Sequence, residues 1–536
     1  MNFGERKEKV WRAFNAFRGY TPVDRYTEAA FLINKTKRIL REKGVKPSQE
    51  ECYETMLTVA DKYEIINPFE NAFDFYKVFQ ATDEELDWEM VLLAEDDHTM
   101  SSRFYIPEVL LRCFDDHISN DVKTILIPEA EKFALTITET VDAHPDKSFT
   151  LTTINSVAKA VLDEIFAGYE NVCILQTSIY MYEFSALKFD FIMSVPVFGV
   201  RDKAEESPFI CREYDLIAVE NLLLHLNSGG ELMIVIPARI TFAAGDVKEL
   251  REFIQSMYCL KEIAELPGGI FLPTSVKTML FTLTTGRTED VAIKRLVADT
   301  KNPRRDGISQ LIIHDETFVM LEELQDMGDW NVDKVFALQD EDYQRFQNSD
   351  VRKKTLGEVA DIFRGKNVAK KDPTGNIGFV NISNLGVYSI VTEGMDHINE
   401  ESRKVANYLL EEGDVLIPAR GTAIRIAVFE EQSYPCIASS NIVTIRPHKE
   451  VLLSSYLKLF LDSPMGRTLL SAMQQGTTVM NISYNDLKAM EVPIPPLKEQ
   501  QKIADEYEKE LKRYHKSIQD AEERWQRVVE RLQREF

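Results

Sequence analysis

The sequence lacks the features that mark membrane, secreted and metal-dependent proteins. No apolar run in the 536 residues is long enough to span a bilayer, and the charged N-terminal segment MNFGERKEKVWRAF does not fit a secretory signal. The six cysteines are scattered without a CxxC pair, which argues against a zinc ribbon or a disulfide framework. The eight histidines form neither an HExxH pattern nor a ligand cluster, so we expect no metal. These absences favour a cytoplasmic protein.

Several catalytic signatures are missing as well. The sequence has no Walker-type glycine loop, no PD…ExK-like nuclease spacing, and no serine or cysteine in a recognisable nucleophile arrangement. Gly229 and Gly230 fit a turn that enters a strand rather than a phosphate cradle. We therefore expect any ATP hydrolysis to come from a partner.

Charge is divided unevenly along the chain. Residues 351–536 contain 26 basic and 26 acidic side chains, so the whole net charge of −24 lies in residues 1–350. An acidic body repels phosphate and is a poor nucleic-acid binder, whereas the balanced C-terminal part can approach a polyanion. The acidic part either keeps the body soluble or faces a basic partner.

The hydrophobic pattern of the first 300 residues changes near residue 100. Residues 1–100 show apolar positions at helical spacing, which predicts a helical N-terminal domain. In residues 101–300, short apolar runs alternate with amphipathic stretches, as is typical of a doubly wound α/β sheet with its ligand at the carboxyl ends of the strands. The predicted strands are Val122–Ile127, Asn171–Leu175, Phe189–Met193, Glu231–Ile236, Lys277–Thr284 and Val291–Val297.

The rest of the chain follows other patterns. Residues 301–350 predict a connecting segment, and residues 351–498 contain short β segments separated by glycine and asparagine turns, which indicates an α+β domain. Residues 499–536 predict one long helix. Its apolar residues recur every three or four positions and form a coiled-coil stripe of Ile503, Tyr507, Leu511, Tyr514, Ile518, Ala521, Trp525, Val528 and Leu532. A single helix cannot bury this stripe, so we expect it to pack on this chain, on a second copy or on another protein.

Five segments of the C-terminal third occur in the order of one family. They are Leu356–Lys366, Gly413–Thr422, Ser439–Pro447, Gln475–Thr478 and Ile482–Ala504, of which the last (ISYNDLKAMEVPIPPLKEQQKIA) is the most specific. This part resembles one target-recognition domain, with its following helix, of the specificity subunit of type I restriction-modification systems. Such proteins carry two recognition domains in tandem, whereas this chain carries one. The resemblance therefore implies a homo-oligomer or an assembly with other restriction-modification or defence subunits.

The same resemblance implies double-stranded DNA as a partner. Arginine and lysine suit guanine, asparagine and glutamine suit adenine, and hydroxyl groups suit either base, although half or more of such contacts go to phosphate. The loop residues of these types are Arg364, Lys366, Asn367, Lys370, Lys371, Asn384, Arg420, Thr422, Arg425, Gln474, Thr477 and Asn481. We predict that they form a DNA-facing group in which most members position the duplex rather than read it.

Three segments in the middle of the chain carry a second resemblance: Phe104–Val109 (FYIPEV), Leu222–Pro237 (LLLHLNSGGELMIVIP) and Leu250–Thr284. They resemble the modification (methylase) subunit of the same systems, which implies an N6-adenine DNA methyltransferase fold. That family binds S-adenosylmethionine with a strand followed by a D-P-x-x-G-[ST]-G-type loop, whose glycines let the backbone approach the cofactor.

The cofactor loop is degenerate in this sequence. Pro128 is kept, but Ile127 takes the acid position, and Glu131 and Phe133 take the glycine positions. A phenylalanine prevents the close backbone approach, and Glu131 would repel the carboxylate of the cofactor. We therefore expect no cofactor.

The catalytic loop is degenerate too. The family uses an NPPF/Y-type loop, in which the Asn and the first Pro carbonyl accept hydrogen bonds from the adenine amino group and the aromatic ring stacks on the flipped base. Here Ser194 replaces Asn, Val195 replaces Pro, Pro196 is kept, and Phe198 lies one position beyond the aromatic site. A serine hydroxyl cannot copy the amide acceptor, so we expect no catalytic residues.

Three functions stay open on the sequence alone. The first is a DNA-recognition protein of a restriction-modification-like or phage-defence complex, with a pseudo-methyltransferase as scaffold. The second is an active adenine-specific DNA methyltransferase with an atypical S-adenosylmethionine pocket. The third is a regulatory or structural subunit that does not bind DNA and acts through its coiled coil and acidic surface.

Overall fold

The chain folds as two compact units, Met1–Trp330 and Asn331–Phe536. The computed structural model describes residues 3–44, 47–82, 85–92, 106–134, 136–182, 184–271, 276–301, 308–368, 370–420, 425–475, 481–482 and 484–534. Within these ranges, no helix is both long and apolar enough to cross a membrane.

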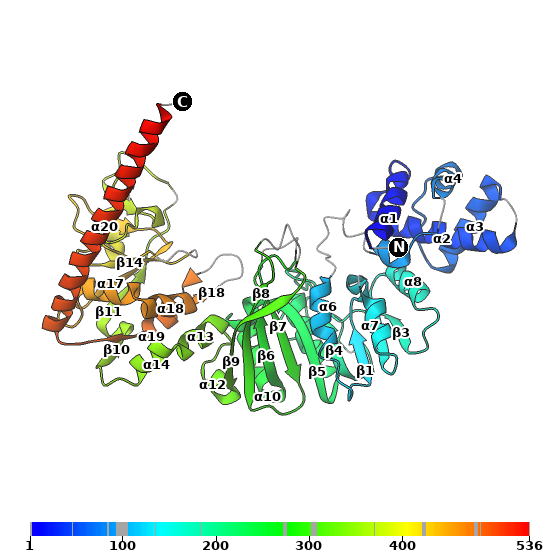
Figure 1. Cartoon of the computed structure of the whole chain (residues 1–536), viewed down its shortest axis with the longest axis horizontal. Helices are drawn as coiled ribbons and strands as arrows, with labels where there is room; N and C mark the ends of the chain where they lie inside the picture. The colour runs from blue at the N-terminus through cyan, green and yellow to red at the C-terminus, as the bar shows by residue number, and fades with distance from the viewer. Residues whose placement is uncertain are drawn as a thin grey trace. The chain divides into compact units, whose positions relative to one another are not determined.

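The first unit begins with a helical region, drawn in blue in Figure 1. It contains α1 (Phe3–Phe17), η1 (Val23–Arg25), α2 (Tyr26–Lys43), α3 (Gln49–Lys62) and α4 (Ala72–Ala81). Ser48 starts α3 with a capping box, because its hydroxyl accepts from Glu51 N while the Glu51 carboxylate accepts from Ser48 N. The buried amide of Asn34 bonds both Leu86 N and Leu86 O at 2.8 Å. The predicted helical N-terminal region is thereby confirmed.

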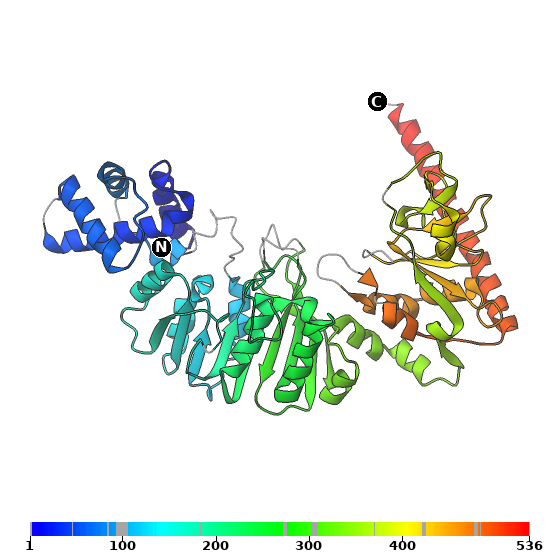
Figure 2. The ribbon, with the colours of Figure 1, turned by 180° about the vertical axis from the view of Figure 1, so that it is seen from behind.

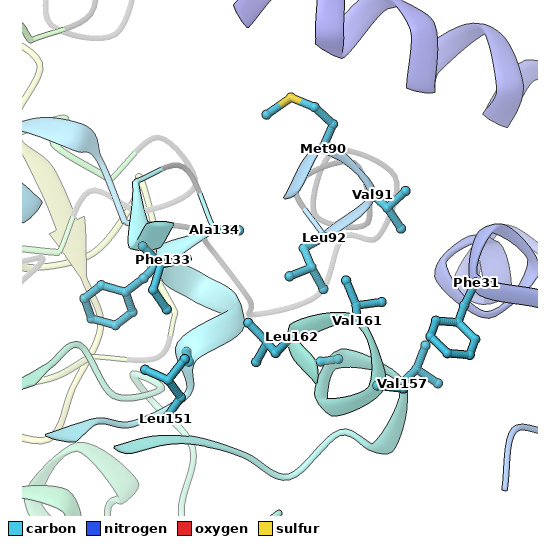
Figure 3. Close-up of a cluster of buried hydrophobic side chains, with 14 of the residues drawn as sticks. Phe31, Met90, Val91, Leu92, Phe133, Ala134, Leu151, Val157, Val161 and Leu162 are labelled. Atoms are coloured by element: carbon cyan, nitrogen blue, oxygen red, sulfur yellow. The ribbon is translucent and has the colours of Figure 1, made fainter. Parts of the chain in front are cut away.

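One continuous apolar core joins this helical region to the α/β part of the unit. Figure 3 shows Phe31 of α2 facing Val157 of α8 (Ser156–Ile165). An ion pair between Lys35 Nζ and Glu164 Oε1, 2.5 Å apart, spans the same two helices. The α/β sheet is therefore packed against the N-terminal helices as part of one unit.

Nine strands form the central sheet, in the order β3-β2-β1-β4-β5-β7-β6-β8-β9. Strands β1 to β5 are parallel, and β7 runs antiparallel between β5 and β6. The strands are β1 (Thr124–Ile127), β2 (Ser148–Thr153), β3 (Val172–Gln176), β4 (Phe189–Ser194), β5 (Leu226–Pro237), β6 (Cys259–Glu265), β7 (Thr278–Thr284), β8 (Asp290–Ala298) and β9 (Leu311–Met320). This arrangement confirms the doubly wound, methyltransferase-like sheet.

Helices and 3-10 turns connect these strands. They are α6 (Glu108–Asp115), η2 (Ala130–Phe133), α7 (Ile137–Ala143), α8, α9 (Tyr214–Leu224), η3 (Ala238–Thr241), α10 (Asp246–Met257) and α12 (Leu321–Asp326). Helix α9 is apolar nearly all round and lies against β5, and its residues Leu216 to Leu223 are buried. A helix of this kind is expected in the interior of a large α/β layer.

Three strands of the sheet were not predicted, because their sequences lack a continuous apolar run. Strand β2 (SFTLTT) is rich in threonine, and β6 (CLKEIAE) mixes charged and apolar residues. Strand β9 lies in the stretch 301–350 that the sequence predicts as a connecting segment, yet it pairs with β8 from Leu311 to Met320. Hydrogen bonds to neighbouring strands stabilise these segments even though their side chains are not continuously apolar.

The second unit contains several small sheets with short helices between them. The larger two have the orders β11-β17-β14-β15 and β13-β12-β16, and two-stranded pairs join β10 to β20 and β18 to β19. The strands are β10 (Lys353–Thr355), β11 (Ala360–Arg364), β12 (Ile377–Val380), β13 (Asp396–Ile398), β14 (Val415–Pro418), β15 (Ala427–Val428), β16 (Cys436–Ala438), β17 (Ile442–Pro447), β18 (Gln474–Gln475), β19 (Asn481–Ile482) and β20 (Glu491–Pro493). This is the predicted α+β domain.

The helices of this unit precede, connect and follow its sheets. They are α13 (Val332–Gln339), α14 (Glu341–Gln347), α15 (Leu356–Val359), η4 (Ile382–Asn384), α16 (Ser402–Val405), η5 (Ala406–Tyr408), α17 (Ser454–Asp462), α18 (Pro464–Ala472), α19 (Tyr484–Ala489) and α20 (Leu497–Gln533). Figure 2 shows α20 as one continuous helix, in red. The predicted long C-terminal helix is confirmed.

The apolar stripe of α20 is partly covered at Tyr507 and Leu511, which are half-buried, and exposed further on. Tyr507 OH lies 3.1 Å from Asp462 Oδ2 of α17, whereas Ile503, the first residue of the stripe, is 36% exposed. Toward the end of the helix, the side chains of Tyr514 and Trp525 are 61% and 66% exposed. Pairing of this part of the stripe with a partner stays a prediction.

Candidate functional site

The first candidate site lies where the strand order of the large sheet reverses direction, between β1 and β4. In open α/β sheets, ligands bind in the crevice beyond the carboxyl ends of the strands at such a switch point. Ile127 ends β1 and Ser194 ends β4, and both side chains are buried. The two degenerate loops of the sequence therefore follow neighbouring strands and meet at this crevice.

The loop after β1 turns sharply into η2. Pro128 is followed by Glu129, which has a left-handed backbone with φ of 51° although it is not a glycine. Phe133 is completely buried and its ring lies 6.3 Å from that of Phe114. The amide of Ile106, from the FYIPEV segment, donates to Lys132 O at 2.8 Å. Residue 133 is thus an anchor in the apolar core, whereas the family pattern has a glycine at this position.

The loop after β4 is equally enclosed. Val195 and Pro196 are buried, and Phe198 meets the ring of Phe271 at 5.8 Å in an edge-on arrangement. The hydroxyl oxygen of Ser194 is buried and has no hydrogen-bond partner among the described residues. The serine therefore offers no oriented acceptor in this state of the protein.

Lys132 links the two loops. Its side chain is only 4% exposed, and Nζ donates to Glu129 Oε2 at 2.7 Å and to the backbone carbonyl of Val195 at 3.0 Å. The second bond crosses the crevice from the β1 loop to the β4 loop.

Tyr180, from the segment after β3, makes a second link. Its hydroxyl donates to Glu129 Oε2 at 3.0 Å and accepts from Val197 N at 2.9 Å. Burial raises the pKa of Tyr180, so the phenol keeps the proton that it donates. The ring stacks on Tyr214 of α9 at a centroid distance of 4.3 Å. Tyr180 and Lys132 together fix both loops through one carboxylate.

Glu131 brings a second carboxyl group to the loop after β1. Its Oε2 atom is buried without a hydrogen-bond partner in the part of the chain that the structure describes. The pKa of Glu131 is raised to about 7, mainly by burial; the nearby Glu129 carboxylate acts in the same direction, and hydrogen bonds to its own backbone and to Thr153 act against it. This group stays largely protonated below neutral pH and carries a poorly solvated charge above it.

These residues do not fit an S-adenosylmethionine site. The loop that should bring glycine backbone against the cofactor carries the side chains of Glu129 and Glu131 instead, and the Glu129 carboxylate is already paired with Lys132. The side chain of Phe133 occupies core space at the second glycine position. Metal chemistry has no evident ligand set either, since the described residues contain no group of three or more His, Cys, Asp or Glu placed to hold an ion.

The second candidate site is one edge of the four-stranded sheet in the second unit. Strands β11 and β14 both run antiparallel to β17, so their carboxyl ends lie at the same edge as the start of β17. Arg364 ends β11, and Arg420 follows β14 by two residues. Arg364 Nε donates to Ser440 O at 2.8 Å, and Arg420 Nε donates to Asn481 Oδ1 at 3.1 Å. Arg364 and Asn481 are 117 positions apart in the sequence, yet the structure brings them to one edge of the sheet. We name this edge, formed by Arg364, Lys366, Arg420 and Asn481, the basic edge.

Lys366 has a structural role within the basic edge. Its Nζ donates to Lys404 O at 2.9 Å and lies 5.6 Å from the centre of the Tyr408 ring. Its backbone bridges to Ser439 at the end of β16. Lys366 therefore connects the two larger sheets of the unit and supplies charge there as well.

The other predicted DNA-facing residues fall into different surroundings. Asn367, Lys370 and Lys371 are exposed near the same sheet ends, and Lys371 Nζ lies 2.6 Å from Asp396 Oδ2. Asn384 is buried, with its Oδ1 accepting from Asn381 N and its Nδ2 donating to Val391 O, which argues against a base contact and corrects its inclusion in the predicted group.

The remaining members of the predicted group are Arg425, Gln474, Thr422 and Thr477. Arg425 is exposed and lines a cavity of about 960 Å³ beside α20. The backbone of Gln474 pairs in β18 with Ile482. Thr422 and Thr477 lie outside the described residues.

Sequence reasoning missed several residues at both sites. Arg403 and Lys404 of α16 are exposed and lie beside Lys366, because Lys404 O accepts from Lys366 Nζ. Their position side by side in the sequence, as two consecutive basic residues, could have indicated that they belong to the DNA-facing group. Lys132 and Tyr180 gave no signal, because the bonds that join the loops, from Lys132 to Val195 and from Tyr180 to Glu129, span 63 and 51 residues of the sequence.

Comparisons with known families agree with this division of the chain. A match to the N-6 DNA methylase family covers residues 150–351, and a match to the type I restriction modification DNA specificity domain covers residues 348–519. The chain joins an N-6 DNA methylase domain to a type I DNA specificity domain. The match to the methylase domain includes the loop after β4 and begins downstream of the loop after β1. The basic edge lies within the specificity domain.

Two curated relatives, both specificity subunits by name, are similar to part of this chain. One is a type I restriction enzyme specificity subunit of Haemophilus influenzae, 30% identical over 151 residues, which are 28% of this chain and 37% of the relative. The other is the EcoR124I/EcoR124II specificity subunit of Escherichia coli, 26% identical over 172 residues, 30% of this chain and 41% of the relative. The chain thus spans less than half the length of either relative.

Among solved structures, the chain is similar to a type I restriction-modification methyltransferase subunit from Streptococcus thermophilus. The identity is 13% and the TM-score 0.46, over 61% of this chain and 98% of that one.

Proposed function

We propose that this chain is a sequence-specific double-stranded-DNA-recognition protein of a restriction-modification-type or phage-defence complex. Its specificity domain reads DNA, and its methylase domain serves as a scaffold that transfers no methyl group. The observation that carries the first part is the basic edge, because a domain of the DNA-specificity type gathers Arg364, Lys366 and Arg420 at one set of strand ends.

The basic edge can attract DNA locally even though the chain as a whole carries a net negative charge. The first 350 residues hold the whole net charge of −24, so any DNA contact depends on local clusters rather than on a long-range field. Both guanidinium groups are oriented through Nε by an acceptor, at Ser440 O and at Asn481 Oδ1. Orientation of this kind lowers the entropy lost when an arginine binds phosphate or guanine.

The enclosed crevice supports the absence of methyl transfer. Base-modifying enzymes take a flipped base into a pocket and hold it by hydrogen bonds and stacking. Here the Val195 carbonyl already accepts from Lys132, the Ser194 hydroxyl is buried, and Glu131 opposes an anionic cofactor group. Each of these features would have to change before substrate and cofactor could enter.

The exposed half of α20 supports assembly with a second copy or with another restriction-modification subunit. Ile518, Trp525 and Leu532 follow coiled-coil spacing and are all exposed. A chain with one specificity domain would read a two-part target by such pairing.

The test of DNA recognition begins with selection from a random duplex library by the full chain. We expect one enriched sequence motif. Arg364→Ala and Arg420→Ala should each weaken binding to that motif about tenfold or more, and loss of a phosphate contact should lower the slope of log K against log salt by about 1. Arg345→Ala, an exposed arginine of α14 paired with Glu341 and Asp342, is the control and should bind as the unaltered chain does. Failure to enrich any motif would support a regulatory subunit instead.

The test of the scaffold role is separate. Calorimetric titration with S-adenosylmethionine should give no binding, and labelled cofactor should leave no methyl group on the selected DNA. Tight binding or transfer would contradict the scaffold proposal and identify an active adenine methyltransferase.

A further inference from the structure

The switch-point crevice between β1 and β4 holds an internal cation. Lys132 projects into it from η2 and is almost completely removed from solvent. Moving an ammonium group out of water is costly unless acceptors surround it, so a buried lysine reports the polarity of its surroundings.

Two acceptors receive hydrogen bonds from Lys132 Nζ. Glu129 Oε2 and the Val195 carbonyl are both acceptors, at 2.7 and 3.0 Å. The Tyr180 hydroxyl does not compete for Lys132, because it donates to Glu129 and accepts from Val197 N. Tyr180 instead holds the carboxylate in place. An ammonium group has three donors and no acceptor, so it is suited to a place where both partners are acceptors.

We propose that the switch-point crevice is a primary-ammonium-binding site whose resident ligand is the side chain of Lys132. This proposal adds to the scaffold role by naming the group that fills the crevice. It rests on the proposed function in one respect, namely that the domain is a methylase-like scaffold. The chemical class of ligand is a primary alkylammonium ion, bound by the Glu129 carboxylate and the Val195 backbone carbonyl.

Chemical rescue tests this assignment. Lys132→Ala removes three methylene groups and the ammonium, which together correspond to n-propylammonium. We expect the variant to have a folding equilibrium constant at least tenfold lower than that of the unaltered full chain. Addition of n-propylammonium chloride should raise its melting temperature in a saturable manner, whereas n-propanol and sodium chloride at equal concentration should not.

Two control variants make the test specific. Lys147 is as buried as Lys132, at 3% exposure, and it too donates to a backbone carbonyl, Asn120 O at 3.1 Å, but its carboxylate partner Asp146 has a side chain that is 65% exposed. Lys147→Ala should therefore lose stability without saturable rescue. In the pair Glu129→Gln with Lys132→Ala, rescue by n-propylammonium should disappear because the carboxylate is gone. Equal rescue of Lys132→Ala by n-propanol, or rescue that survives Glu129→Gln, would overturn the assignment.

A second measurement covers the outcome in which Lys132→Ala fails to fold. Lys132→Met keeps the bulk of the side chain and removes its charge, which leaves the Glu129 carboxylate buried without its cation. We expect faster exchange of the amide hydrogens of Val195, Val197 and Phe198 in this variant, and partial recovery of stability when Glu129→Gln is added. A double variant no more stable than Lys132→Met would contradict the ammonium site.

Neither measurement uses DNA or S-adenosylmethionine. Failure of rescue would therefore reject the ammonium site and leave DNA recognition untouched. Methyl transfer by the unaltered chain would reject the scaffold role whatever the rescue shows.

Discussion

Glu131 is a carboxyl group whose charged form is unfavourable where it lies. Its Oε2 atom is buried and lacks a hydrogen-bond partner among the described residues, and burial raises its pKa to about 7. An unfolded glutamate titrates near about 4.3. Between these two values the folded chain binds more protons than the unfolded chain, so the contribution of Glu131 to stability falls as pH rises from about 4.3 to about 7.

Substituting this residue should stabilise the protein at alkaline pH. Glu131→Gln keeps the shape without the charge, so we expect it to raise the free energy of unfolding by up to about 3 kcal/mol at pH 8, with the difference shrinking to about 1 kcal/mol at pH 5 and toward zero below about pH 4. Denaturant unfolding across this pH range measures the effect. Glu139→Gln, at an exposed position of α7, is the control and should show no such pH dependence. A Glu131→Gln chain that is less stable at pH 8 would argue that the carboxylate is needed in its charged form.

Gly365 lets the basic edge form. A Cβ atom at this position would lie 2.2 Å from Ser439 O and 2.4 Å from Ala438 O, both of which are backbone atoms that cannot move aside easily. Gly365→Ala should therefore destabilise the second unit by about 2 kcal/mol or more and weaken binding to the selected DNA. Thermal unfolding and DNA titration measure the two effects. Gly168→Ala, where a Cβ meets nothing within 4 Å, is the control and should leave both unchanged.

The sequence located the residues of the crevice but not their connections. Ile127, Glu131, Phe133 and Ser194 were found because they replace specific residue types in ordered motifs. The bond from Lys132 to Val195 joins two loops that are adjacent only after β1 and β4 pair. A single sequence carries no signal for such a contact, since neither residue type nor spacing is unusual.

At the scale of elements, α20 is attached by a buried polar cluster. Lys458 of α17 is fully buried, is ion-paired with Asp462, and lies 5.5 and 5.7 Å from the ring centres of Tyr388 and Tyr507. Arg467 Nη2 also lies 3.0 Å from Asp462 Oδ1. One carboxylate therefore balances two cations and receives the hydroxyl of an α20 residue.

Removing that carboxylate should loosen the helix. Asp462→Asn leaves the buried ammonium of Lys458 without its counter-charge, which should cost about 3 kcal/mol and raise amide exchange in residues 497–511 of α20. Hydrogen exchange of the full chain measures this. Asp342→Asn is the control, because its ion pair with Arg345 is exposed on both sides and surface pairs contribute little. Unchanged exchange in α20 would mean that apolar contacts alone hold the helix.

Elements with strong apolar runs could be predicted from the sequence, and others could not. Strands β4, β5 and β7 are buried on both faces and have continuous apolar runs. Strand β2 forms because β1 and β3 bond it on both sides, and β9 forms because β8 supplies a long partner. The long helix could be predicted from the spacing of its apolar residues. Gln500 was noticed only as part of the motif that resembles the family, and its role was not predicted: its buried amide bonds Leu453 N, Val451 O and Pro495 O.

At the scale of the whole molecule, charge and apolar surface are allotted to different parts of the chain. The excess of 24 acidic groups lies in residues 1–350, while residues 351–536 are balanced. Contact with DNA through the basic edge should weaken as salt rises, because each phosphate that the edge contacts releases counterions and because the acidic residues add no attraction of their own. We expect affinity for the selected motif to fall at least tenfold between 50 and 200 mM salt, as measured by fluorescence titration. A flat salt dependence would place the binding outside the basic edge.

The exposed stripe of α20 makes a prediction about assembly. Ile518, Trp525 and Leu532 together present large apolar side chains that the described part of the chain leaves 38%, 66% and 45% exposed. Pairing two such stripes buries them, and burial of one large side chain contributes about 1.5–3 kcal/mol. We expect the full chain to self-associate at micromolar concentration in sedimentation velocity, and Trp525→Glu to weaken association at least tenfold. Gln526→Glu makes the same charge change beside the stripe and should leave association intact. A monomer at all concentrations would assign the stripe to a different subunit, and equal effects of both variants would trace the loss to charge rather than to the apolar seam.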